Sequence, residues 1–313
     1  MARPLVSILI VTYNQAAFLV EALDSAIAQA WEPLEIVVAD DGSTDTTGQL
    51  LADYAALDPR IRVVSGPNLG ITPNCNRGLR ACRGEYIAFM GGDDVLLPGK
   101  IAAQIAWFDA HPAGVLCAHD VESFVSATNE VLPDGSAARW RKIGGRGPGE
   151  LLRKGNLFAA PAVMIKRSAA PAYGFDERLP LVSDGKLWLD VLAGGGEWGS
   201  IPGIWTRYRR HGQNTTSLWF ERCWTEAFMT RAIFEAEHPE YAADCQQGRA
   251  MLMYRRGVHH LGLGEEAAAD VHLRAALRLA PTVSWKLPIW YGISRLPGPL
   301  RRRALRATGA VRG

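Results

Sequence analysis

The sequence predicts an α/β protein whose mostly parallel sheet carries helices on both faces, with a helical extension at its C-terminal end. Short apolar runs alternate with helical repeats four times before Pro98, and the pattern loosens after it. From Ser217 on, only helical spacing is found. Strands that alternate with helices are joined by crossovers, and these crossovers place helices on both faces of a parallel sheet.

Four apolar runs have the length of buried strands rather than of helices. They predict strands at Val6–Thr12, Leu34–Ala39, Ile61–Ser65 and Tyr86–Met90. Between them, apolar residues recur every three or four positions, which predicts helices over Phe18–Ile27, Thr47–Tyr54 and Cys75–Cys82. Polar residues that directly follow the four runs are therefore expected at one edge of the sheet.

The rest of the chain is less regular. Further elements are expected as helices over Lys100–Ala110 and Asp184–Leu192, strands over Val115–Ala118, Ala162–Ile165 and Ser200–Ile204, and a mobile loop over residues 133–149. An antiparallel helix pair is expected over Arg249–Leu263 and Glu265–Leu279, ended by Pro281. We therefore expect an α/β domain over residues 1–213, divided near residue 110, and a helical region with a basic tail over residues 214–313.

Composition restricts the class of protein. The 313 residues are 48% hydrophobic and 21% charged, which is ordinary for a globular chain, and the net charge of +2 gives no case for nucleic-acid binding. The apolar run Leu5–Val11 is too short to span a bilayer, and residues 1–4 do not have the form of a signal peptide. Five scattered cysteines without metal-ligand spacing are typical of reduced thiols in a cytoplasmic protein.

Residues 285–313 are basic and contain no Asp or Glu. Apolar residues such as Trp285 and Ile289 lie among the basic ones. This pattern suits peripheral contact with the anionic inner face of a membrane. It also suits a C-terminal helix that packs on the domain and ends in a solvated arginine tail, and both interpretations stay open.

Two pairs of carboxylates follow predicted strands. Asp40 and Asp41 come after the second strand, and Asp93 and Asp94 come after the fourth, where Gly91-Gly92 lets the backbone bend. Ligands of open α/β sheets bind at this edge, and a hard cation that carries substrate phosphates relieves the repulsion between adjacent carboxylates. We therefore expect Mg²⁺ or Mn²⁺ at Asp93 and Asp94. The alternative is a solvated turn, in which Asp is common.

Other residues at the same edge suit a nucleotide. Asp41 can accept a hydrogen bond from the imide N–H of a uracil-like base. Thr12, Tyr13 and Asn14 follow the first strand, and Tyr13 can stack on the base. Each residue taken singly has an ordinary structural alternative, such as packing for Tyr13.

The order and spacing of several motifs resemble family 2 inverting glycosyltransferases. The match over the first 110 residues rests on Val6–Asn14 (VSILIVTYN), Asp40–Asp45 (DDGSTD), Asn68–Gly70 (NLG), Asn76–Leu79 (NRGL) and Gly84–Ile87 (GEYI), followed by Asp93-Asp94. A weaker match continues through Gly174–Glu177 (GFDE), Asp184 with Leu187–Leu189 (LWL), and Tyr208–Gly212 (YRRHG).

The resemblance implies a GT-A fold, a Rossmann-like sheet in which residues 1–110 bind a nucleotide-sugar donor and residues 111–213 bind the acceptor. It implies a divalent metal, Mn²⁺ or Mg²⁺, and a UDP- or dTDP-sugar as the favoured donor. The acceptor is expected to be a glycan or a lipid-linked molecule.

The roles of single residues follow from the same motifs. Asp41 is expected to contact the base, and Asn76 is also assigned to nucleotide binding. Asp94 is expected to be the main metal ligand with Asp93 beside it, and His211 a late contact to metal or phosphate. Asp184 is expected to be the catalytic base.

The chain departs from the family pattern at two positions. Many members have Asp-x-Asp-Asp where this chain has Gly91-Gly92-Asp93-Asp94, and Ser183 stands where Glu is common before the base. The Gln-x-x-Arg-Trp motif of processive polysaccharide synthases is absent from the sequence. The absence of this motif and the lack of an apolar run long enough to span a bilayer favour an enzyme that adds a single sugar. Surface polysaccharide or glycolipid synthesis is the expected pathway class.

Several of these residues and motifs have alternative interpretations. Asp184 can merely cap a helix, and His211 can be a solvated loop residue. His119-Asp120 is either an acid/base or acceptor-binding pair or an ordinary strand-end turn. Gly194–Gly199 matches a dinucleotide-binding pattern, but it follows a helix and precedes a strand, which is the wrong context. The alternative function is a catalytically weak, nucleotide-sugar-binding scaffold in a glycan assembly complex.

Overall fold

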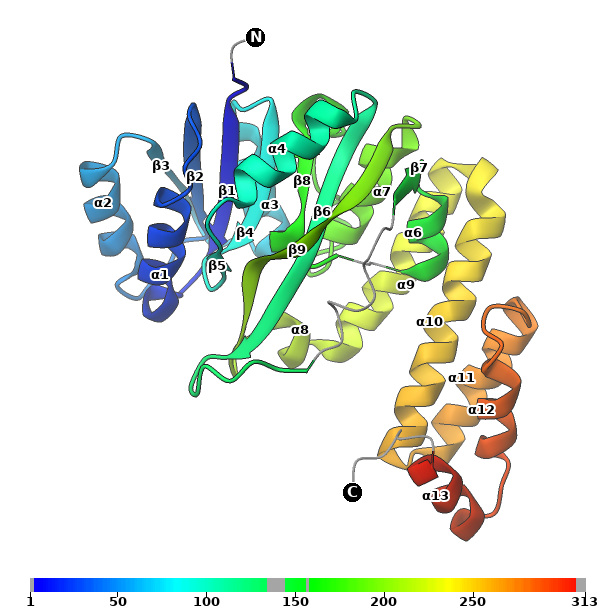
Figure 1. The fold of residues 1–313 in the computed structure, drawn as a ribbon. Coiled ribbons are helices and arrows are strands. Elements are labelled where there is room, and N and C mark those ends of the chain that lie inside the picture. Colours follow the sequence, from blue (N-terminus) through cyan, green and yellow to red (C-terminus); the bar gives the residue numbers. More distant parts are fainter. Residues whose placement is uncertain (1–2, 134–143, 156–157, 308–313) are drawn as a thin grey trace. The chain divides into compact units, whose positions relative to one another are not determined.

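The computed structural model describes residues 3–133, 144–155 and 158–307 (Figure 1). The chain forms two compact units. The sheet unit comprises Met1–Pro148 and Phe158–Cys223, and the helical unit comprises Gly149–Leu157 and Trp224–Gly313. This division falls later than the predicted boundary after residue 213, since Asn214 still donates a hydrogen bond to Asp93 of the sheet unit.

The described residues of the sheet unit form nine strands and most of the predicted helices. Its strands are β1 (Val6–Thr12), β2 (Leu34–Asp40), β3 (Ile61–Ser65), β4 (Tyr86–Gly91), β5 (Val95–Leu96), β6 (Gly114–Val125), β7 (Gly144–Arg146), β8 (Met164–Lys166) and β9 (Glu197–Arg210). Its helices are α1 (Ala16–Ile27), α2 (Thr47–Leu57), α3 (Ile71–Ala81), α4 (Lys100–Ala110), α7 (Asp184–Ala193) and α8 (Thr215–Leu218), with short 3₁₀ turns at Ala160–Ala162 and Arg167–Ala169.

The strands form one sheet in the order β3-β2-β1-β4-β8-β6-β9-β5, with β7 paired to β9. β1 pairs in parallel with both β2 and β4, β2 with β3, and β6 with β9. The short strands β5, β7 and β8 pair antiparallel. The mostly parallel sheet predicted from the sequence is confirmed.

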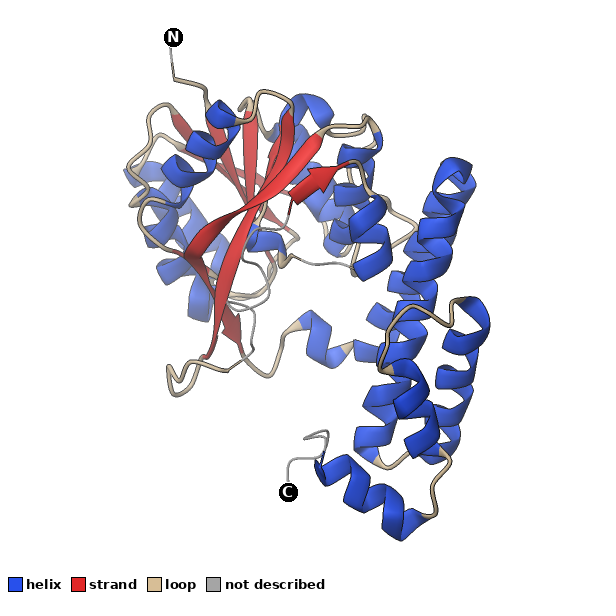
Figure 2. Cartoon of the chain, turned by 45° about the vertical axis from the view of Figure 1, so that its right-hand side comes forward, coloured by secondary structure: helices blue, strands red, loops and turns tan. Residues whose placement is uncertain are grey.

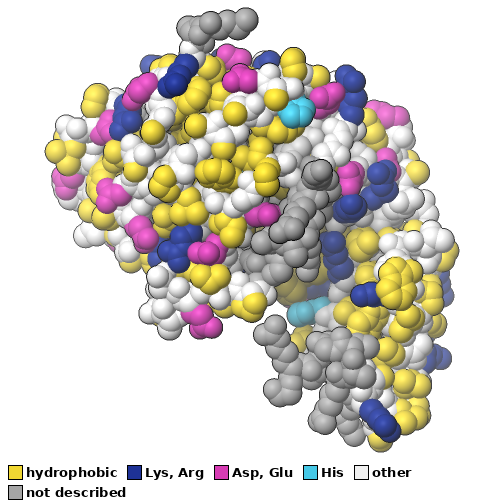
Figure 3. Space-filling model, viewed as in Figure 1, with side chains coloured by type: hydrophobic (Ala, Val, Ile, Leu, Met, Phe, Trp, Pro, Cys, Tyr) yellow, Lys and Arg dark blue, Asp and Glu magenta, His cyan; other side chains and the backbone are white. Residues whose placement is uncertain are grey.

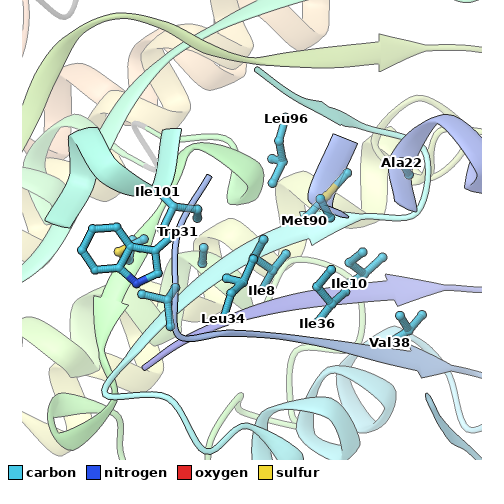
Figure 4. Packing of buried hydrophobic residues seen from close by; sticks show 14 of the residues in the cluster. Ile8, Ile10, Ala22, Trp31, Leu34, Ile36, Val38, Met90, Leu96 and Ile101 are labelled. Carbon is cyan, nitrogen blue, oxygen red and sulfur yellow. The ribbon is translucent and has the colours of Figure 1, made fainter. Parts of the chain in front are cut away.

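One face of the sheet is covered by α1, α2 and α4. The inward residues of β1 and β2, among them Ile8 and Ile36, are fully buried against apolar residues of these helices (Figure 4). Ala22 of α1 and Ile101 of α4 belong to the same cluster. The alternate side chains of β1 point to the opposite face, as the two-residue period of a strand requires.

The opposite face is covered by α3 and α7. Gly78 of α3 lies so close to Leu9 and Ala39 that a side chain there would collide with them. In α7, Trp188 packs edge-on against Phe89 of β4 with ring centroids 5.0 Å apart. Helices on both faces are therefore confirmed, and they leave the strand ends as the place where polar loops gather.

Two sequence predictions need adjustment. Most of the predicted loop 133–149 lies outside the described residues, but Gly144–Arg146 form β7. The Gly194–Gly199 run does connect a helix to a strand, with Gly194 at the end of α7, but β9 already begins at Glu197. This context confirms that the run is not a dinucleotide-binding loop, which lies between a strand and a helix.

In the part of the helical unit that the structure describes, all regular elements are helices (Figure 2). They are α6 (Gly149–Lys154), α9 (Phe220–Glu237, which begins in the sheet unit), a 3₁₀ turn (Pro239–Tyr241), α10 (Ala242–Leu263), α11 (Glu266–Leu279), α12 (Leu287–Ser294) and α13 (Gly298–Ala307). Gly264, in the left-handed conformation, turns the chain between α10 and α11.

Glycines set the close helix contacts of this unit. A side chain at Gly257 of α10 would collide with Leu273 of α11, and one at Gly248 would collide with the backbone of Leu152 in α6. Leu151 and Leu152 are buried, so α6 is held by α10 although it precedes α10 by many residues. Among the described residues of the whole chain, no helix combines the length and apolarity needed to cross a membrane.

Candidate active site

The polar strand ends predicted from the sequence come together at one edge of the sheet. β1 lies between β2 and β4, so its end at Thr12 separates the two acidic loops. The backbone ties them directly, since Asp41 N donates to Thr12 O at 3.1 Å and Gly92 N donates to Val11 O at 2.9 Å. The end of β1 therefore lies next to both Asp41 and the Asp93–Asp94 loop.

Asp41 is buried, and its carboxylate is well supplied with hydrogen-bond donors. One oxygen accepts from Leu69 N at 3.0 Å and the other from Gly70 N at 2.9 Å. Gly70 is the N-cap of α3, where a helix has unpaired donors, and Leu69 directly precedes it. Arg77 lies 3.7 Å away as a cationic neighbour. Asp41 is thus fixed in place before any ligand binds.

The residues after β1 divide into two kinds. Thr12 is buried and, among the described residues, its hydroxyl has no hydrogen-bond partner, while Tyr13 has an exposed side chain. Asn14 adopts the left-handed conformation, and its side-chain oxygen accepts from Thr44 N at 2.8 Å. Thr12 and Tyr13 can therefore meet a ligand, while Asn14 joins this segment to the loop after β2.

Asp94 contrasts with Asp41, because it is 3% exposed and poorly supplied with donors. One of its oxygens accepts from Arg209 N at 3.2 Å and the other from Gly91 N at 3.4 Å, both long bonds. Its burial, and then the neighbouring charge of Asp93, raise the pKa of Asp94 well above its ordinary value. A positive charge at this position would stabilise the ionised carboxylate.

Gly91 explains how both carboxylates reach the same point. A Cβ at Gly91 would lie 2.5 Å from Oδ1 of Asp93 and 3.2 Å from Oδ2 of Asp94. The two oxygens therefore converge above a residue that has no side chain. Gly91 stands where many family members have the first acidic residue of the motif. The side chain of Asp93 occupies the space that a side chain at position 91 would take.

His211 holds the other oxygen of Asp93. Its Nε2 lies 2.9 Å from Asp93 Oδ2, and Gln213 N donates to its Nδ1 at 3.2 Å. Because Nδ1 accepts a hydrogen bond, the proton of a neutral ring lies on Nε2, which then donates to Asp93. The ring also packs on Phe18, with centroids 4.6 Å apart. His211 therefore orients Asp93 in this structure, and its contact with a metal or phosphate stays a prediction.

Comparison with known proteins places these features in a family. The model described as glycosyl transferase family 2 matches residues 7–174, more than half of the chain. The chain belongs to glycosyl transferase family 2. An uncharacterized protein of Mycobacterium tuberculosis is 33% identical over 212 residues, which cover 66% of this chain and 58% of that relative. This family 2 chain therefore spans less than two thirds of the length of that relative.

Solved structures share the fold. S. aureus TarS residues 1–349 in complex with UDP-GlcNAc has a TM-score of 0.68 at 17% identity, covering 97% of this chain and 92% of that one. The mannosyltransferase PcManGT from Pyrobaculum calidifontis, in complex with GDP-Man and Mn²⁺, has a TM-score of 0.64 at 19% identity, covering 99% and 80%. The predicted GT-A fold is confirmed.

The other predicted residues of this family 2 chain lie on α3, α7 and β6. Asp184 begins α7, where its Oδ1 accepts from Gly185 N at 2.7 Å. The preceding Ser183 lies 2.9 Å from the Thr72 hydroxyl of α3. The donors to Asp41 lie directly before α3. The N-terminal end of α3 therefore helps to position both Asp41, the candidate for base contact, and Asp184, the candidate catalytic base.

Asn76 and His119 lie deeper in the fold. Asn76 is buried, and its amide donates to Phe175 O at 2.9 Å and accepts from Phe175 N at 2.7 Å. It therefore holds the Gly174–Glu177 segment on α3, while its assignment to nucleotide binding stays a prediction. His119 is buried within β6, where burial holds its pKa well below the ordinary value. An uncharged, buried imidazole does not suit contact with an acceptor.

The carboxylates at this edge can hold a divalent cation whose remaining ligands are oxygens of the substrate. Among the described residues, no group of three or more His, Cys, Asp or Glu side chains is arranged to hold a metal ion. Mg²⁺ and similar cations are commonly held by one or two carboxylates together with substrate phosphates and water. Asp93 and Asp94, whose oxygens converge over Gly91, meet that requirement.

Sequence reasoning missed Arg209. Its side-chain Nε donates to the carbonyl oxygen of Asp93 at 2.7 Å, and its backbone N–H donates to the carboxylate of Asp94. The signal was present, because Arg209 belongs to the Tyr208–Gly212 segment (YRRHG), which also contains the predicted site residue His211.

Proposed function

We propose that this family 2 chain transfers one sugar from a nucleoside-diphosphate sugar to a hydroxyl group of a glycan or lipid-linked acceptor, with inversion at the anomeric carbon. The observation that carries the proposal is the convergence of Asp93 and Asp94 beside Thr12 and Asp41 at the carboxyl edge of the sheet. Surface polysaccharide or glycolipid synthesis is the pathway class that such a transfer serves.

The donor nucleotide lies, in this proposal, along the end of β1. Asp41 is fixed by two backbone donors, and its remaining lone pairs can accept the imide N–H of uracil or thymine. The exposed ring of Tyr13 can stack on the base. A UDP- or dTDP-sugar is therefore the favoured donor, and the UDP-GlcNAc bound to TarS supports a donor of this class.

Mn²⁺ or Mg²⁺ would be held by Asp94 and Asp93, with His211 at the outer oxygen of Asp93. When bound, such a cation offsets the negative charge that develops on the leaving diphosphate. The Mn²⁺ in the PcManGT structure supports this assignment. The chain's own contribution is to fix both carboxylates: Arg209 and Gly91 donate backbone N–H groups to Asp94, and His211 donates to Asp93.

Asp184 is the proposed general base. It accepts the proton of the acceptor hydroxyl as that oxygen attacks the anomeric carbon from the side opposite the diphosphate. Its place at the first residue of α7, anchored through Ser183 to α3, brings it from a different segment than the Asp93–Asp94 loop. One direct displacement then yields the inverted anomer.

A calorimetric panel tests this function. UDP, dTDP, GDP and their sugars are titrated into the protein with Mn²⁺ and with EDTA, and slow release of free nucleotide from each donor is followed without acceptor. We expect binding of one uracil or thymine nucleotide that depends on Mn²⁺, and slow donor hydrolysis. Binding without hydrolysis or transfer points instead to the scaffold function, and no nucleotide binding at all contradicts the proposal.

We also propose that the chain works at the inner, cytoplasmic face of a membrane, through residues 285–313. Trp285, Ile289 and Leu300 are 76%, 50% and 55% exposed. Lys286 and Arg303 are exposed as well, and each basic residue near an anionic surface contributes about 1 kcal/mol. Figure 3 shows hydrophobic and basic side chains on the part of the helical unit that faces the viewer.

Surface substitutions test this contact better than truncation does. Leu287, Ile293 and Leu305 are buried in the core of the helical unit, so removing α12 and α13 would damage that core. Trp285→Ser with Ile289→Ser changes only exposed positions. We expect the double variant to bind anionic vesicles more weakly in flotation, and equal binding of both proteins contradicts the contact.

A further inference from the structure

The side chain of Arg209 is buried and is held on all sides. Its Nε donates to the Asp93 carbonyl oxygen at 2.7 Å, and one terminal nitrogen forms an ion pair with Glu21 of α1. The guanidinium also lies 5.2 Å from the ring centre of Phe18 and 4.6 Å from that of Phe124. These contacts fix both the position and the plane of the guanidinium.

The backbone of Arg209 contacts the same loop. Its N–H donates to Asp94 Oδ1 at 3.2 Å, so one residue contacts both aspartates. The neighbouring pairing of β9 with β5 places Arg207 opposite Val95, immediately after Asp94. The strand that carries Arg209 therefore sets the position of the Asp93–Asp94 loop from the side opposite β1.

These contacts require an arginine for geometric reasons. A guanidinium is planar, stacks on aromatic rings and donates from Nε in a fixed direction, whereas a lysine ammonium is a point charge on a flexible stem. A role that depended on positive charge alone would be kept by lysine. A role that depends on the Nε–H bond to Asp93 would be lost.

We propose that Arg209 is a positioning residue that holds the Asp93–Asp94 loop in the form that binds the donor diphosphate. This inference rests on the proposed function of the site. Arg209 acts through Asp93 and Asp94 and does not itself need to touch the donor. It joins three parts of the sheet unit, namely β9, α1 and the loop after β4.

The test compares Arg209→Lys with Arg207→Lys. Arg207 is a matched control, because it lies on the same strand, stacks on the same Phe124 ring and pairs with Glu122 at 2.9 Å. In the part of the chain that the structure describes, its side-chain hydrogen bonds go to Glu122 and Asn129 and not to either aspartate. UDP affinity is measured by calorimetry with Mn²⁺ and with EDTA, and thermal unfolding is recorded for each protein.

We expect Arg209→Lys to weaken the Mn²⁺-dependent affinity for UDP by roughly 10–100-fold, the usual cost of losing a group that orients metal ligands. Its affinity in EDTA should stay at the wild-type level, because the base contacts at Asp41 and Tyr13 are unchanged. Arg207→Lys should bind as the wild type in both conditions. If the substitution instead destabilised the whole fold, the affinity for UDP would fall both with Mn²⁺ and in EDTA.

The outcomes separate the two proposals. A folded Arg209→Lys variant that binds UDP like the wild type overturns this inference alone. A wild-type protein that binds no UDP, or binds it equally in EDTA, overturns the proposed function and this inference with it. If Arg209→Lys fails to fold, Glu21→Gln provides the test, because Glu21 is half exposed and anchors the guanidinium. That variant should lose about twofold to fivefold of the Mn²⁺-dependent affinity, and an unchanged affinity contradicts the inference.

Discussion

Asp41 and Asp94 occupy equivalent places in the sheet, yet their surroundings differ. Each is a buried aspartate just beyond a parallel strand that pairs with β1. Asp41 accepts two bonds of ordinary length, 3.0 and 2.9 Å, from the backbone directly before α3 and has Arg77 nearby. Asp94 accepts two long bonds and has Asp93 as its neighbour.

The difference shows that burial alone does not define a role. A buried carboxylate that is fully hydrogen-bonded contributes to the folded structure and is presented rigidly to a ligand. A buried carboxylate without compensation destabilises the fold until a cation arrives. The comparison therefore predicts opposite effects on stability for the same chemical change at the two positions.

Asp184 gives the strictest test, since it accepts a backbone hydrogen bond as Asp41 does but is proposed to be catalytic. Asp184→Asn keeps a side-chain oxygen that can accept the bond from Gly185 N, so the thermal midpoint should stay close to the wild-type value. Transfer should fall by about 10²–10⁴-fold, the usual contribution of a general base, while donor affinity is retained. Turnover at the wild-type rate, or a product with retained anomeric configuration, would reject the assignment.

Asp94→Asn should give the next largest effect, on binding. We expect loss of most of the Mn²⁺-dependent affinity for UDP, because a neutral amide is a poorer ligand for a hard cation than a carboxylate. The fold should remain intact or gain stability in metal-free buffer, since an uncompensated buried charge is removed. Calorimetry that shows unchanged affinity would exclude Asp94 as the main ligand.

Asp41→Asn should lower stability, in contrast with Asp94→Asn. The amide oxygen of an asparagine can accept from only one of the two donors, Leu69 N and Gly70 N. The NH₂ group of the same side chain then faces the other donor. Leaving a buried donor unpaired costs about 1–3 kcal/mol in the free energy of unfolding. Urea denaturation of both variants in EDTA checks this, and a destabilised Asp94→Asn beside a stable Asp41→Asn would reverse the comparison.

The smallest effect is a pH dependence. The pKa of Asp94 in the folded protein is raised, so the folded state binds more protons than the unfolded state above the unfolded pKa of about 3.9. This contribution to stability is present at acidic pH and is lost as pH rises through the folded pKa. In EDTA, the stability difference between Asp94→Asn and wild type should therefore grow with rising pH, and a constant difference would contradict the raised pKa.

The local pattern of the sequence was sufficient for the first half of the sheet unit. β1 and β3 have the predicted bounds, because buried parallel strands are short, continuous apolar runs. β6 and β9 are much longer than predicted. They carry polar residues and register shifts near His119 and Asp120, and they pair with each other over a long sequence separation, so a local pattern cannot reveal them.

The candidate site divides in the same way. Asp41, Asp93 and Asp94 follow strands directly, and their gathering at one edge was predictable from strand order. The hydrogen-bonding role of Asn76 toward Phe175, and that of Arg209 toward Asp93, depend on residues about a hundred positions away. Contacts over such separations leave no local pattern in the sequence, so only the folded structure shows which backbone carbonyl each of these side chains binds.

The early position of α6 in the chain has a consequence for biosynthesis. Leu151 and Leu152 are buried by α10, which ends at Leu263, so 109 residues separate the end of α6 at Lys154 from the end of its partner. A ribosome that adds about 5–20 residues each second leaves this leucine pair without its partner for roughly 5 to 20 s. A chain released early, for example after Cys223, would keep two leucines with no helix to cover them, which makes it a natural substrate for chaperones and proteases.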